Sequence, residues 1–250
     1  MSNKSIALQL YTIRDETARD FKATIRHVAK LGYSGVEFAG YGDISADEMA
    51  ALLAETGLRT AGSHVRWDAL ENDLEREISY CLAVGSHHIT LPYLGNEWYT
   101  GEKFKTLPAQ LNEFGRIAQQ RGVTFSYHNH AHEFAQSEDG RYLLDTLLDS
   151  TDPAYVKLEL DTYWAAYAGV DPIAYLHKRA GRVPLIHLKD MTPERTFSEV
   201  GDGTLNIQGI CKAAAESGVE WYIVENDAPT LPSLESAERS LANLRKILGE

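Results

Sequence analysis

The sequence is poor in cysteine and in positive charge. Its 250 residues contain two cysteines, Cys81 and Cys211, which fit neither a disulfide framework nor a zinc ribbon. The 24 Lys and Arg residues are outnumbered by 36 Asp and Glu residues, and the net charge of −12 argues against nucleic-acid or anionic-membrane partners. No run reaches the roughly 18 apolar residues of a membrane span, and no secretory signal precedes the first expected strand. We therefore expect a cytoplasmic protein.

Several catalytic motifs are also missing. No G-x-G-x-x-G follows the first expected strand, which weakens a dinucleotide-binding interpretation. Neither G-x-S-x-G nor H-E-x-x-H occurs, so a serine hydrolase or a zinc protease has no support. The turn at Gly201-Asp202-Gly203 is not followed by Lys-Ser or Lys-Thr, so it does not resemble a phosphate-binding loop.

The sequence does show a regular alternation of strand-like and helix-like stretches. Each expected helix is followed by a short apolar run of strand type, which predicts a parallel sheet with right-handed crossovers. Eight such units in a chain of this length favour a single (β/α)8 TIM barrel spanning residues 1–250 over an open sheet. The expected strands are 6–11, 35–38, 59–65, 88–93, 123–130, 156–161, 184–189 and 221–225.

Polar side chains recur near the ends of these strands. In a TIM barrel the active site lies at the C-terminal ends of the strands, so these side chains are expected to converge on one cavity. Chance would not place a polar residue near the same end of nearly every strand. The residues are Gln9, Glu37, His64, His128, His130, Asp161, His187, Lys189 and Glu225.

One residue from each of the last four strands predicts a metal site. Two imidazoles and two carboxylates suit one divalent ion, which could be Mn²⁺, Co²⁺, Fe²⁺, Zn²⁺ or Mg²⁺. Four protein ligands leave room for two neighbouring oxygens of a hydroxy-ketone, whose enediolate the ion would stabilise. A carboxylate could then move a proton between carbons. The four residues are His128, Asp161, His187 and Glu225.

The stretch 124–134 contains three histidines and a glutamate near a strand end. With a period of two, His128 and His130 face the same side of the strand. The fourth metal ligand is therefore open between His128, His130 and Glu133. A structural hydrogen-bonded turn is the alternative interpretation of this stretch.

Three further residues near these strand ends have expected roles. Lys189 lies two residues beyond His187 and faces the same cavity, where it either acts on substrate or pairs with Glu159 or Asp161. Glu159 is expected to pair with a barrel lysine such as Lys157. Asp190 is a candidate to orient His187.

Three motifs carry a resemblance to a known family. Glu-Leu-Asp161-Thr-Tyr-Trp, His187-Leu-Lys189-Asp190 and Ile-Val-Glu225-Asn-Asp resemble the sugar-phosphate isomerase/epimerase superfamily, whose members are xylose isomerase-like TIM barrels. The resemblance covers essentially the whole chain. In the epimerases of this superfamily a divalent metal is held by Glu, Asp, His and Glu from four successive strands. This chain matches the last three positions and has His128 at the first.

The resemblance implies a divalent-metal-dependent isomerase or epimerase of a small sugar, keto-sugar or cyclitol. The alternative is a lyase or hydrolase of the same substrates, either inosose dehydratase-like or cleaving a 3-keto-glycoside, because His128 replaces one acid/base carboxylate of a symmetric epimerisation. The expected partner is a small molecule, and a homo-oligomer is possible. The expected catalytic residues are Glu225, His130 and Lys189, and the expected substrate-binding residues are Gln9, Glu37, His64, Trp164 and Glu133.

Overall fold

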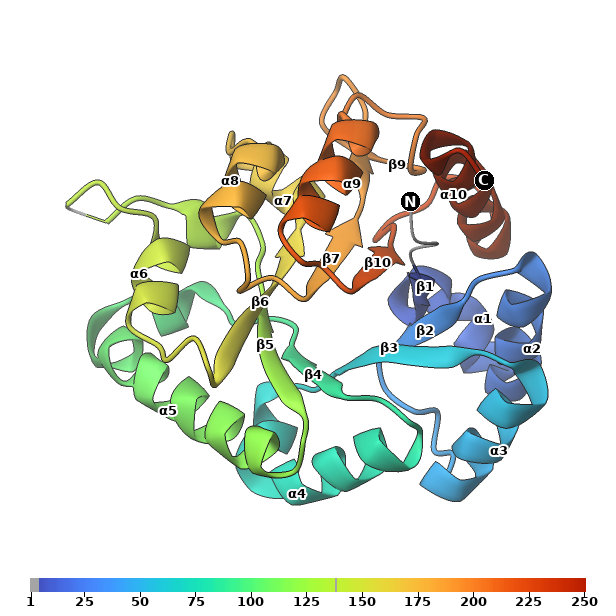
Figure 1. The fold of residues 1–250 in the computed structure, drawn as a ribbon, viewed down its shortest axis with the longest axis horizontal. Coiled ribbons are helices and arrows are strands. Elements are labelled where there is room, and N and C mark those ends of the chain that lie inside the picture. Colours follow the sequence, from blue (N-terminus) through green and yellow to red (C-terminus); the bar gives the residue numbers. More distant parts are fainter. Residues whose placement is uncertain (1–4, 138) are drawn as a thin grey trace.

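The strands of the computed structural model close into a barrel (Figure 1). The structure describes residues 5–137 and 139–250, so residues 1–4, ahead of the first expected strand, lie outside the described part. Every neighbouring pair of barrel strands is parallel, in the order β1-β10-β7-β6-β5-β4-β3-β2, which confirms the expected (β/α)8 barrel. The strands are β1 (Ser5–Gln9), β2 (Gly35–Phe38), β3 (Arg59–His64), β4 (His88–Leu91), β5 (Thr124–His128), β6 (Val156–Asp161), β7 (Leu185–Leu188) and β10 (Trp221–Val224).

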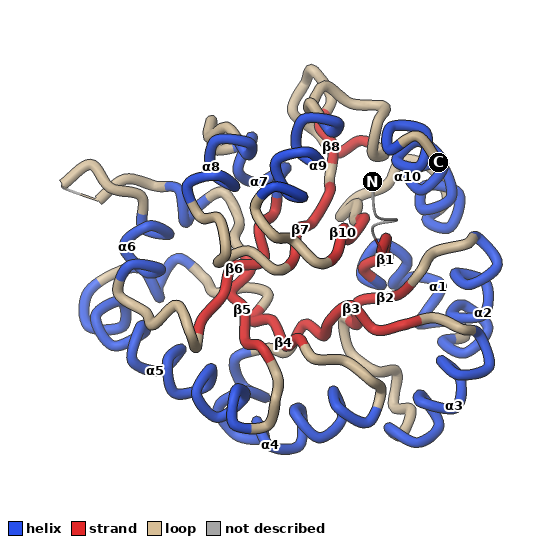
Figure 2. Tube along the Cα trace, in the orientation of Figure 1, coloured by secondary structure: helices blue, strands red, loops and turns tan. Residues whose placement is uncertain are grey.

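Helices surround the barrel, as Figure 2 shows. They cover the outer face of the strands, whose side chains are almost continuously buried, as expected for a parallel sheet packed on both faces. None of the described helices is long and apolar enough to cross a membrane. The helices are α1 (Arg14–Arg19), α2 (Phe21–Leu31), α3 (Ala46–Thr56), α4 (Trp67–Ala83), α5 (Gly101–Gln120), α6 (Leu143–Asp149), α7 (Thr162–Tyr167), α8 (Pro172–Lys178), α9 (Ile207–Glu216) and α10 (Ser233–Leu248), with 3-10 turns η1 (Leu10–Ile13), η2 (Asn96–Tyr99) and η3 (His132–Phe134).

Local sequence signals set the bounds of α3. The Ser45 side chain accepts the backbone N–H of Glu48, and the Glu48 side chain accepts the backbone N–H of Ser45, which forms a capping box. Gly57 ends the helix in the left-handed region, with φ of 73°, where a side chain would be strained. The sequence predicts both ends of this helix to within a residue because each end has its own chemistry.

Other expected bounds are wrong for identifiable reasons. The sequence pattern predicts one helix over residues 17–31, but the structure has two, because Asp20 is extended and its carboxylate caps the N-terminus of α2 by accepting from Ala23 N. The expected strand 123–130 stops at His128, so the period-two argument does not apply to His130. Helix α7 and the short hairpin of β8 (Asp190–Met191) and β9 (Phe197–Ser198) have too few residues for a periodic signal.

The register of the strands brings the site residues together. Across β5 and β6, His128 is the partner of Glu159, and across β6 and β7, Asp161 is the partner of His187. Cross-strand partners in a parallel sheet point to the same face, so these four side chains share the barrel interior. All four are at most 2% exposed.

A buried carboxylate on the outer layer gives a first stability prediction. Asp145 of α6 accepts hydrogen bonds from Tyr175, Lys178 and Arg179 of α8 and its end. Burial alone would raise the pKa of Asp145, but these partners outweigh it and lower the pKa below 3.8. We expect Asp145→Asn to cost about 1–3 kcal/mol of unfolding free energy at pH 7.

The unfolding free energy lost in Asp145→Asn should depend on pH in a direction that follows from the lowered pKa of Asp145. A depressed carboxyl pKa contributes stability above the unfolded-state pKa, and this contribution disappears as pH falls through the folded-state pKa. The difference in unfolding free energy between the wild type and Asp145→Asn should therefore shrink below about pH 4. Urea titrations at pH 7 and pH 3 measure it, and an equal difference at both values would contradict the assignment.

Candidate metal centre

A cavity of about 670 Å³ opens at the C-terminal ends of the barrel strands. Tyr11 and Tyr93 line it and are unusually exposed for aromatic residues, at 45% and 56%. A concave site with a few convergent polar groups and aromatic walls is typical of a small-molecule site. The polar residues on its wall include His64, His128, His130, Lys189, Glu225 and Asp227.

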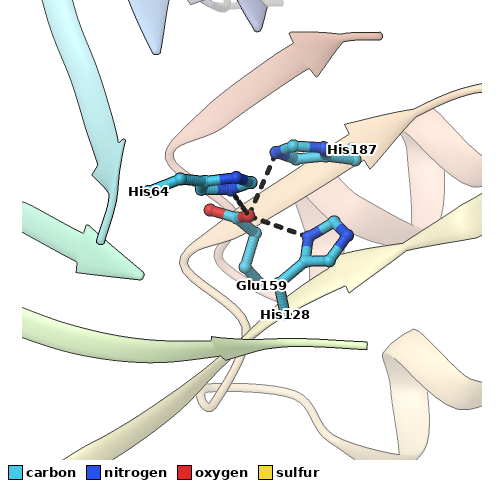
Figure 3. Close-up of side chains that lie close together, drawn as sticks. All are labelled: His64, His128, Glu159 and His187. Carbon is cyan, nitrogen blue, oxygen red and sulfur yellow. Dashed lines mark hydrogen bonds and ion pairs between the residues drawn. The ribbon is translucent and has the colours of Figure 1, made fainter. Parts of the chain in front are cut away.

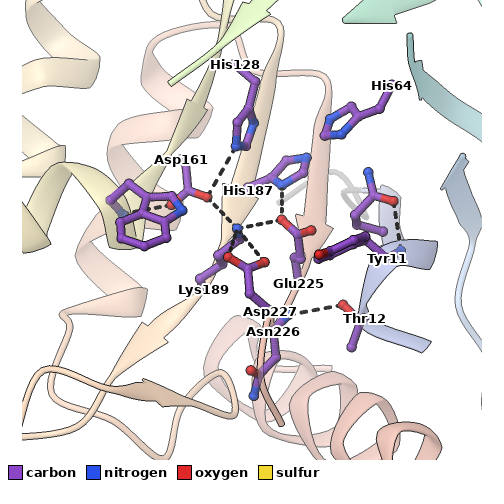
Figure 4. Close-up of polar contacts among 12 residues, drawn as sticks. Tyr11, Thr12, His64, His128, Asp161, His187, Lys189, Glu225, Asn226 and Asp227 are labelled. Atoms are coloured by element: carbon purple, nitrogen blue, oxygen red, sulfur yellow. Dashed lines mark hydrogen bonds and ion pairs between the residues drawn. The ribbon is translucent and has the colours of Figure 1, made fainter. Parts of the chain in front are cut away.

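Four donor atoms from neighbouring strands meet beside this cavity (Figure 4). His187 Nδ1 lies 2.7 Å from Glu225 Oε2, and His128 Nε2 lies 3.6 Å from Asp161 Oδ2. Asp161, His187 and Glu225 each offer a ligand atom within 4.8 Å of the other two. We call His128 Nε2, Asp161 Oδ2, His187 Nδ1 and Glu225 Oε2 the mouth-side donors.

Lys189 connects the two carboxylates of this set. Its Nζ lies 2.9 Å from Asp161 Oδ2 and 2.7 Å from Glu225 Oε2. The same ammonium lies 2.9 Å from Asp227 Oδ1, and the lysine is only 2% exposed. A buried charge must be paired, and here one cation is shared by three carboxylates. The sequence-based alternative of an ion pair with Asp161 is thus observed, and the side chain also lines the cavity.

A second group of side chains lies against the same imidazoles, as Figure 3 shows. Glu159 Oε1 lies 2.7 Å from His64 Nε2, 2.9 Å from His128 Nδ1 and 3.0 Å from His187 Nε2. Its other oxygen, Oε2, accepts a hydrogen bond from the Thr90 hydroxyl at 3.0 Å. We call His64, His128, Glu159 and His187 the Glu159 cluster, whose ligand atoms also lie within 4.8 Å of one another.

The two ligand imidazoles differ in their proton affinity. Burial lowers the pKa of His128 to about 4, so this imidazole is neutral at physiological pH and has a lone pair to offer. Burial also acts to lower the pKa of His187, but Glu159, Glu37 and Glu225 outweigh it and raise the pKa well above its ordinary value. A metal ligand must be neutral imidazole, so His187 would have to release a proton to bind a metal.

The pKa values of two other residues that line the cavity, Glu225 and His130, also depart from their ordinary values. Burial acts to raise the pKa of Glu225, yet the positive charges of Lys189 and His187 hold it well below the ordinary value, so Glu225 is ionised. Burial, the largest cause, together with the nearby Lys189 ammonium, holds the pKa of His130 well below its usual range. His130 is therefore neutral, and its Nδ1 is buried without a hydrogen-bond partner among the described residues.

The expected substrate-binding residues are spread over different places. His64 lines the cavity. Gln9 and Glu37 are fully buried and do not line it. They contact each other instead, and the Gln9 amide donates to Glu37 Oε2 at 2.8 Å. Trp164 packs against His130, with ring centroids 5.5 Å apart, and lines a smaller neighbouring cavity of about 330 Å³.

Glu133 lies inside the loop that follows β5. Its Oε1 accepts from the hydroxyls of Tyr127 and Tyr99 at 2.7 and 3.1 Å, and its Oε2 accepts the backbone N–H of His130 at 2.7 Å. The carboxylate is fully buried and does not line the cavity. Its contacts hold the loop that carries His130, and of the three candidates for the fourth ligand His128 has a ring nitrogen 3.6 Å from Asp161.

Two sequence-based assignments are wrong. Glu159 does not pair with Lys157, whose ammonium contacts the carbonyl of Gly181 instead, and the imidazole contacts of Glu159 were missed. Asp190 does not orient His187, because its carboxylate accepts backbone N–H groups, including that of Gly201. The inward position of Glu159, two residues before Asp161, was the available signal for its proximity to the site.

A comparison with protein families settles the relationship of this barrel. The family model described as xylose isomerase-like TIM barrel matches residues 25–247, which is most of the chain. The chain belongs to this family.

Three relatives of this xylose isomerase-like barrel are informative. This chain is 32% identical over 150 residues to the inosose dehydratase of Clostridium beijerinckii, and the match covers 52% of this chain and 49% of that protein. The chain thus spans about half the length of this curated relative. The inosose dehydratase of Mesomycoplasma hyopneumoniae is 25% identical, with 91% and 89% of the two chains covered. A sugar phosphate isomerase/epimerase from Parabacteroides distasonis has the same fold, with a TM-score of 0.84, 24% identity and 98% of each chain covered.

The mouth-side donors of this family member suit a divalent ion. Asp161 Oδ1 accepts the backbone N–H of Trp164, while Oδ2 is buried and lies 2.9 Å from the Lys189 ammonium. A divalent ion bound at this oxygen would take the place of that ammonium. Two imidazole nitrogens and two carboxylate oxygens are a donor set for Mn²⁺, Co²⁺, Fe²⁺ or Zn²⁺, with Mg²⁺ favoured less because it prefers oxygen ligands.

Proposed function

We propose that the protein is a divalent-metal-dependent isomerase or epimerase of a small sugar, keto-sugar or cyclitol, which moves a proton on a carbon next to a carbonyl. The observation that carries this proposal is the close approach of Asp161, His187 and Glu225, with His128 3.6 Å from Asp161, beside an open cavity that His128 and Glu225 line. His128, Asp161, His187 and Glu225 would hold the ion. When bound, the ion would supply Lewis-acid stabilisation of the negative charge of an enediolate.

Three side chains around the ion would each have a different role in the reaction. Glu225 lines the cavity as an ionised carboxylate, so it can accept a proton from substrate carbon. Lys189 brings a fixed positive charge to the same wall, where it would offset negative charge that develops on substrate oxygens. His130 is neutral with an unpartnered Nδ1, so it can accept a hydrogen bond or a proton from a substrate hydroxyl.

Dehydration of an inosose is the second candidate. It is favoured by the curated relatives, which are inosose dehydratases at 25–32% identity. It needs the same first step, removal of a proton next to a carbonyl, followed by loss of a hydroxyl group. His128 stands where a symmetric epimerase has a second acid/base carboxylate, and elimination does not need that carboxylate.

A product assay separates the two candidates. The Mn²⁺-loaded protein would be incubated with keto-inositols, ketohexoses and 3-keto-glycosides, and the products examined by mass spectrometry and NMR. The isomerase or epimerase proposal expects a product of unchanged mass that gains one deuterium in D₂O. A product lighter by one water identifies the dehydratase, and release of an aglycone identifies glycoside cleavage.

Lys189→Met provides a further prediction. Methionine keeps the length and packing but removes the ammonium, so kcat should fall about 100-fold through lost charge stabilisation. Metal affinity should not weaken, because the ammonium and the ion attract the same two carboxylates, Asp161 and Glu225. Steady-state kinetics and Mn²⁺ calorimetry measure the two effects. If Lys189→Met also lost metal binding, the result would show instead that Lys189 only maintains the shape of the site.

A further inference from the structure

The Glu159 carboxylate is saturated with contacts inside the barrel. Oε1 lies at hydrogen-bond distance from His64 Nε2 and His128 Nδ1, and Oε2 accepts from the Thr90 hydroxyl. Glu159 is fully buried and does not line the cavity, so it does not reach a substrate there. Any influence of Glu159 on the reaction must therefore pass through the imidazoles that it contacts.

His128 divides its two ring nitrogens between two carboxylates. Nδ1 lies 2.9 Å from Glu159 Oε1, and Nε2 faces Asp161 Oδ2 at 3.6 Å. The hydrogen bond that one ring nitrogen makes decides where the proton of a neutral imidazole is carried. Because Glu159 accepts from Nδ1, the lone pair of His128 is placed on Nε2, among the mouth-side donors.

His187 shows the mirror arrangement with a different carboxylate. Its Nε2 lies 2.7 Å from Glu37 Oε2, and its Nδ1 faces Glu225. Glu37 is held in turn by the Gln9 amide, which donates to the same oxygen. The two imidazoles thus present opposite ring nitrogens to the site. Glu159 holds His128, whereas His187 Nε2 lies 2.7 Å from Glu37 and 3.0 Å from Glu159.

We propose that Glu159 is a positioning residue that fixes the tautomer and direction of His128, so that Nε2 is available to a divalent ion. The metal part of this inference rests on the proposed function, whereas the tautomer does not. Carboxylates that accept the second N–H of a ligating imidazole orient the ring, and their loss commonly costs about 10- to 100-fold in metal affinity. The chain therefore positions its imidazoles with buried carboxylates that touch neither substrate nor metal.

An ion held within the Glu159 cluster itself is the competing arrangement. Its four donors also lie within 4.8 Å of one another. The two arrangements use opposite nitrogens of His128, since the cluster would need Nδ1 and the mouth-side donors need Nε2. The contacts favour the mouth-side donors, because Glu159 is held by imidazoles on Oε1 and by the Thr90 hydroxyl on Oε2. The partner of Asp161 Oδ2 is Lys189, which has Asp227 as an alternative carboxylate when an ion binds.

The first arm of the test uses the wild-type protein without metal. Long-range ¹H–¹⁵N NMR of protein labelled with ¹⁵N-histidine reports which nitrogen of each ring carries a proton. We expect His128 to be neutral with its proton on Nδ1. In Glu159→Gln the ring should lose this single tautomer, whereas Glu37→Gln should leave His128 unchanged because Glu37 contacts His64 and His187 instead. A His128 proton on Nε2 in the wild type overturns the proposal.

The second arm uses the metal alone. Mn²⁺ calorimetry should show binding about 10- to 100-fold weaker in Glu159→Gln than in the wild type. Asp145→Asn, which removes another buried carboxylate far from the cavity, should bind Mn²⁺ as the wild type does. NMR of the Zn²⁺-loaded wild type should place the ion on His128 Nε2, and an ion on Nδ1 supports the Glu159 cluster and overturns the inference. If the wild type binds no divalent ion, the proposed function fails, while the metal-free tautomer still decides the role of Glu159.

Discussion

Asp161→Ala and His187→Ala are each expected to abolish divalent-metal binding and to lower kcat/KM by roughly 1,000-fold or more, since several kcal/mol of charge stabilisation are lost. Both side chains are fully buried beside the cavity and belong to the same group of potential ligands. Metal content after dialysis and steady-state kinetics measure the two effects. Circular dichroism should show that the barrel remains folded.

Two further variants make this result specific. Asp161→Asn keeps an oxygen that can cap α7 by accepting from Trp164 N, so it removes the charge without removing the cap. It should still lose most of its metal. His88→Ala is the matched control for His187, because His88 is also a buried histidine but lies at the opposite end of the barrel, where β4 begins. It should keep metal and activity. Retained metal in Asp161→Asn or His187→Ala would contradict the ligand assignment.

For Glu225→Gln we expect a loss of activity much larger than the loss of metal. Glutamine retains an oxygen that can remain a ligand, but it cannot accept a proton, so kcat should fall by about 100- to 10,000-fold. Mn²⁺ affinity should fall by roughly tenfold at most, because three other ligands remain. Kinetics at saturating Mn²⁺ and calorimetry on the same preparation separate the two quantities.

The opposite pattern would assign Glu225 a different role. If Glu225→Gln loses its metal and regains activity when Mn²⁺ is raised, Glu225 is a ligand and not the proton carrier. Deuterium exchange into substrate gives an independent measure, since the variant should lose exchange even when the product is not released. Exchange at the wild-type rate would move the proton-transfer role to His130, which lines the same cavity.

The sequence predicted the barrel well because its signals are local and repeated. Apolar strand runs and glycine stops such as Gly57 recur along the chain, and a capping box at Ser45 and Glu48 marks the start of α3. The strand ends then follow from the fold, so the convergence of Asp161, His187 and Glu225 could be anticipated. The resemblance of three short motifs to a known superfamily pointed to the same residues, and the family match over residues 25–247 agrees with it.

What the sequence could not predict is the depth of each side chain below the cavity. Gln9, Glu37 and Glu133 were assigned to substrate because they stand near strand ends, yet all three are fully buried among protein partners. Glu159 was expected to pair with a barrel lysine such as Lys157 because it faces the barrel interior. Its imidazole contacts depend on the register of β5, β6 and β7, which no local pattern encodes.

The most direct test of the account is a crystal structure of the protein soaked in Mn²⁺, with the ion located by its anomalous scattering. We expect one ion about 2.0–2.3 Å from His128 Nε2, Asp161 Oδ2, His187 Nδ1 and a Glu225 oxygen, with Lys189 turned towards Asp227. An ion bound instead among His64, His128 Nδ1 and Glu159, or no ion at the barrel mouth at all, would contradict the metal centre proposed for this protein.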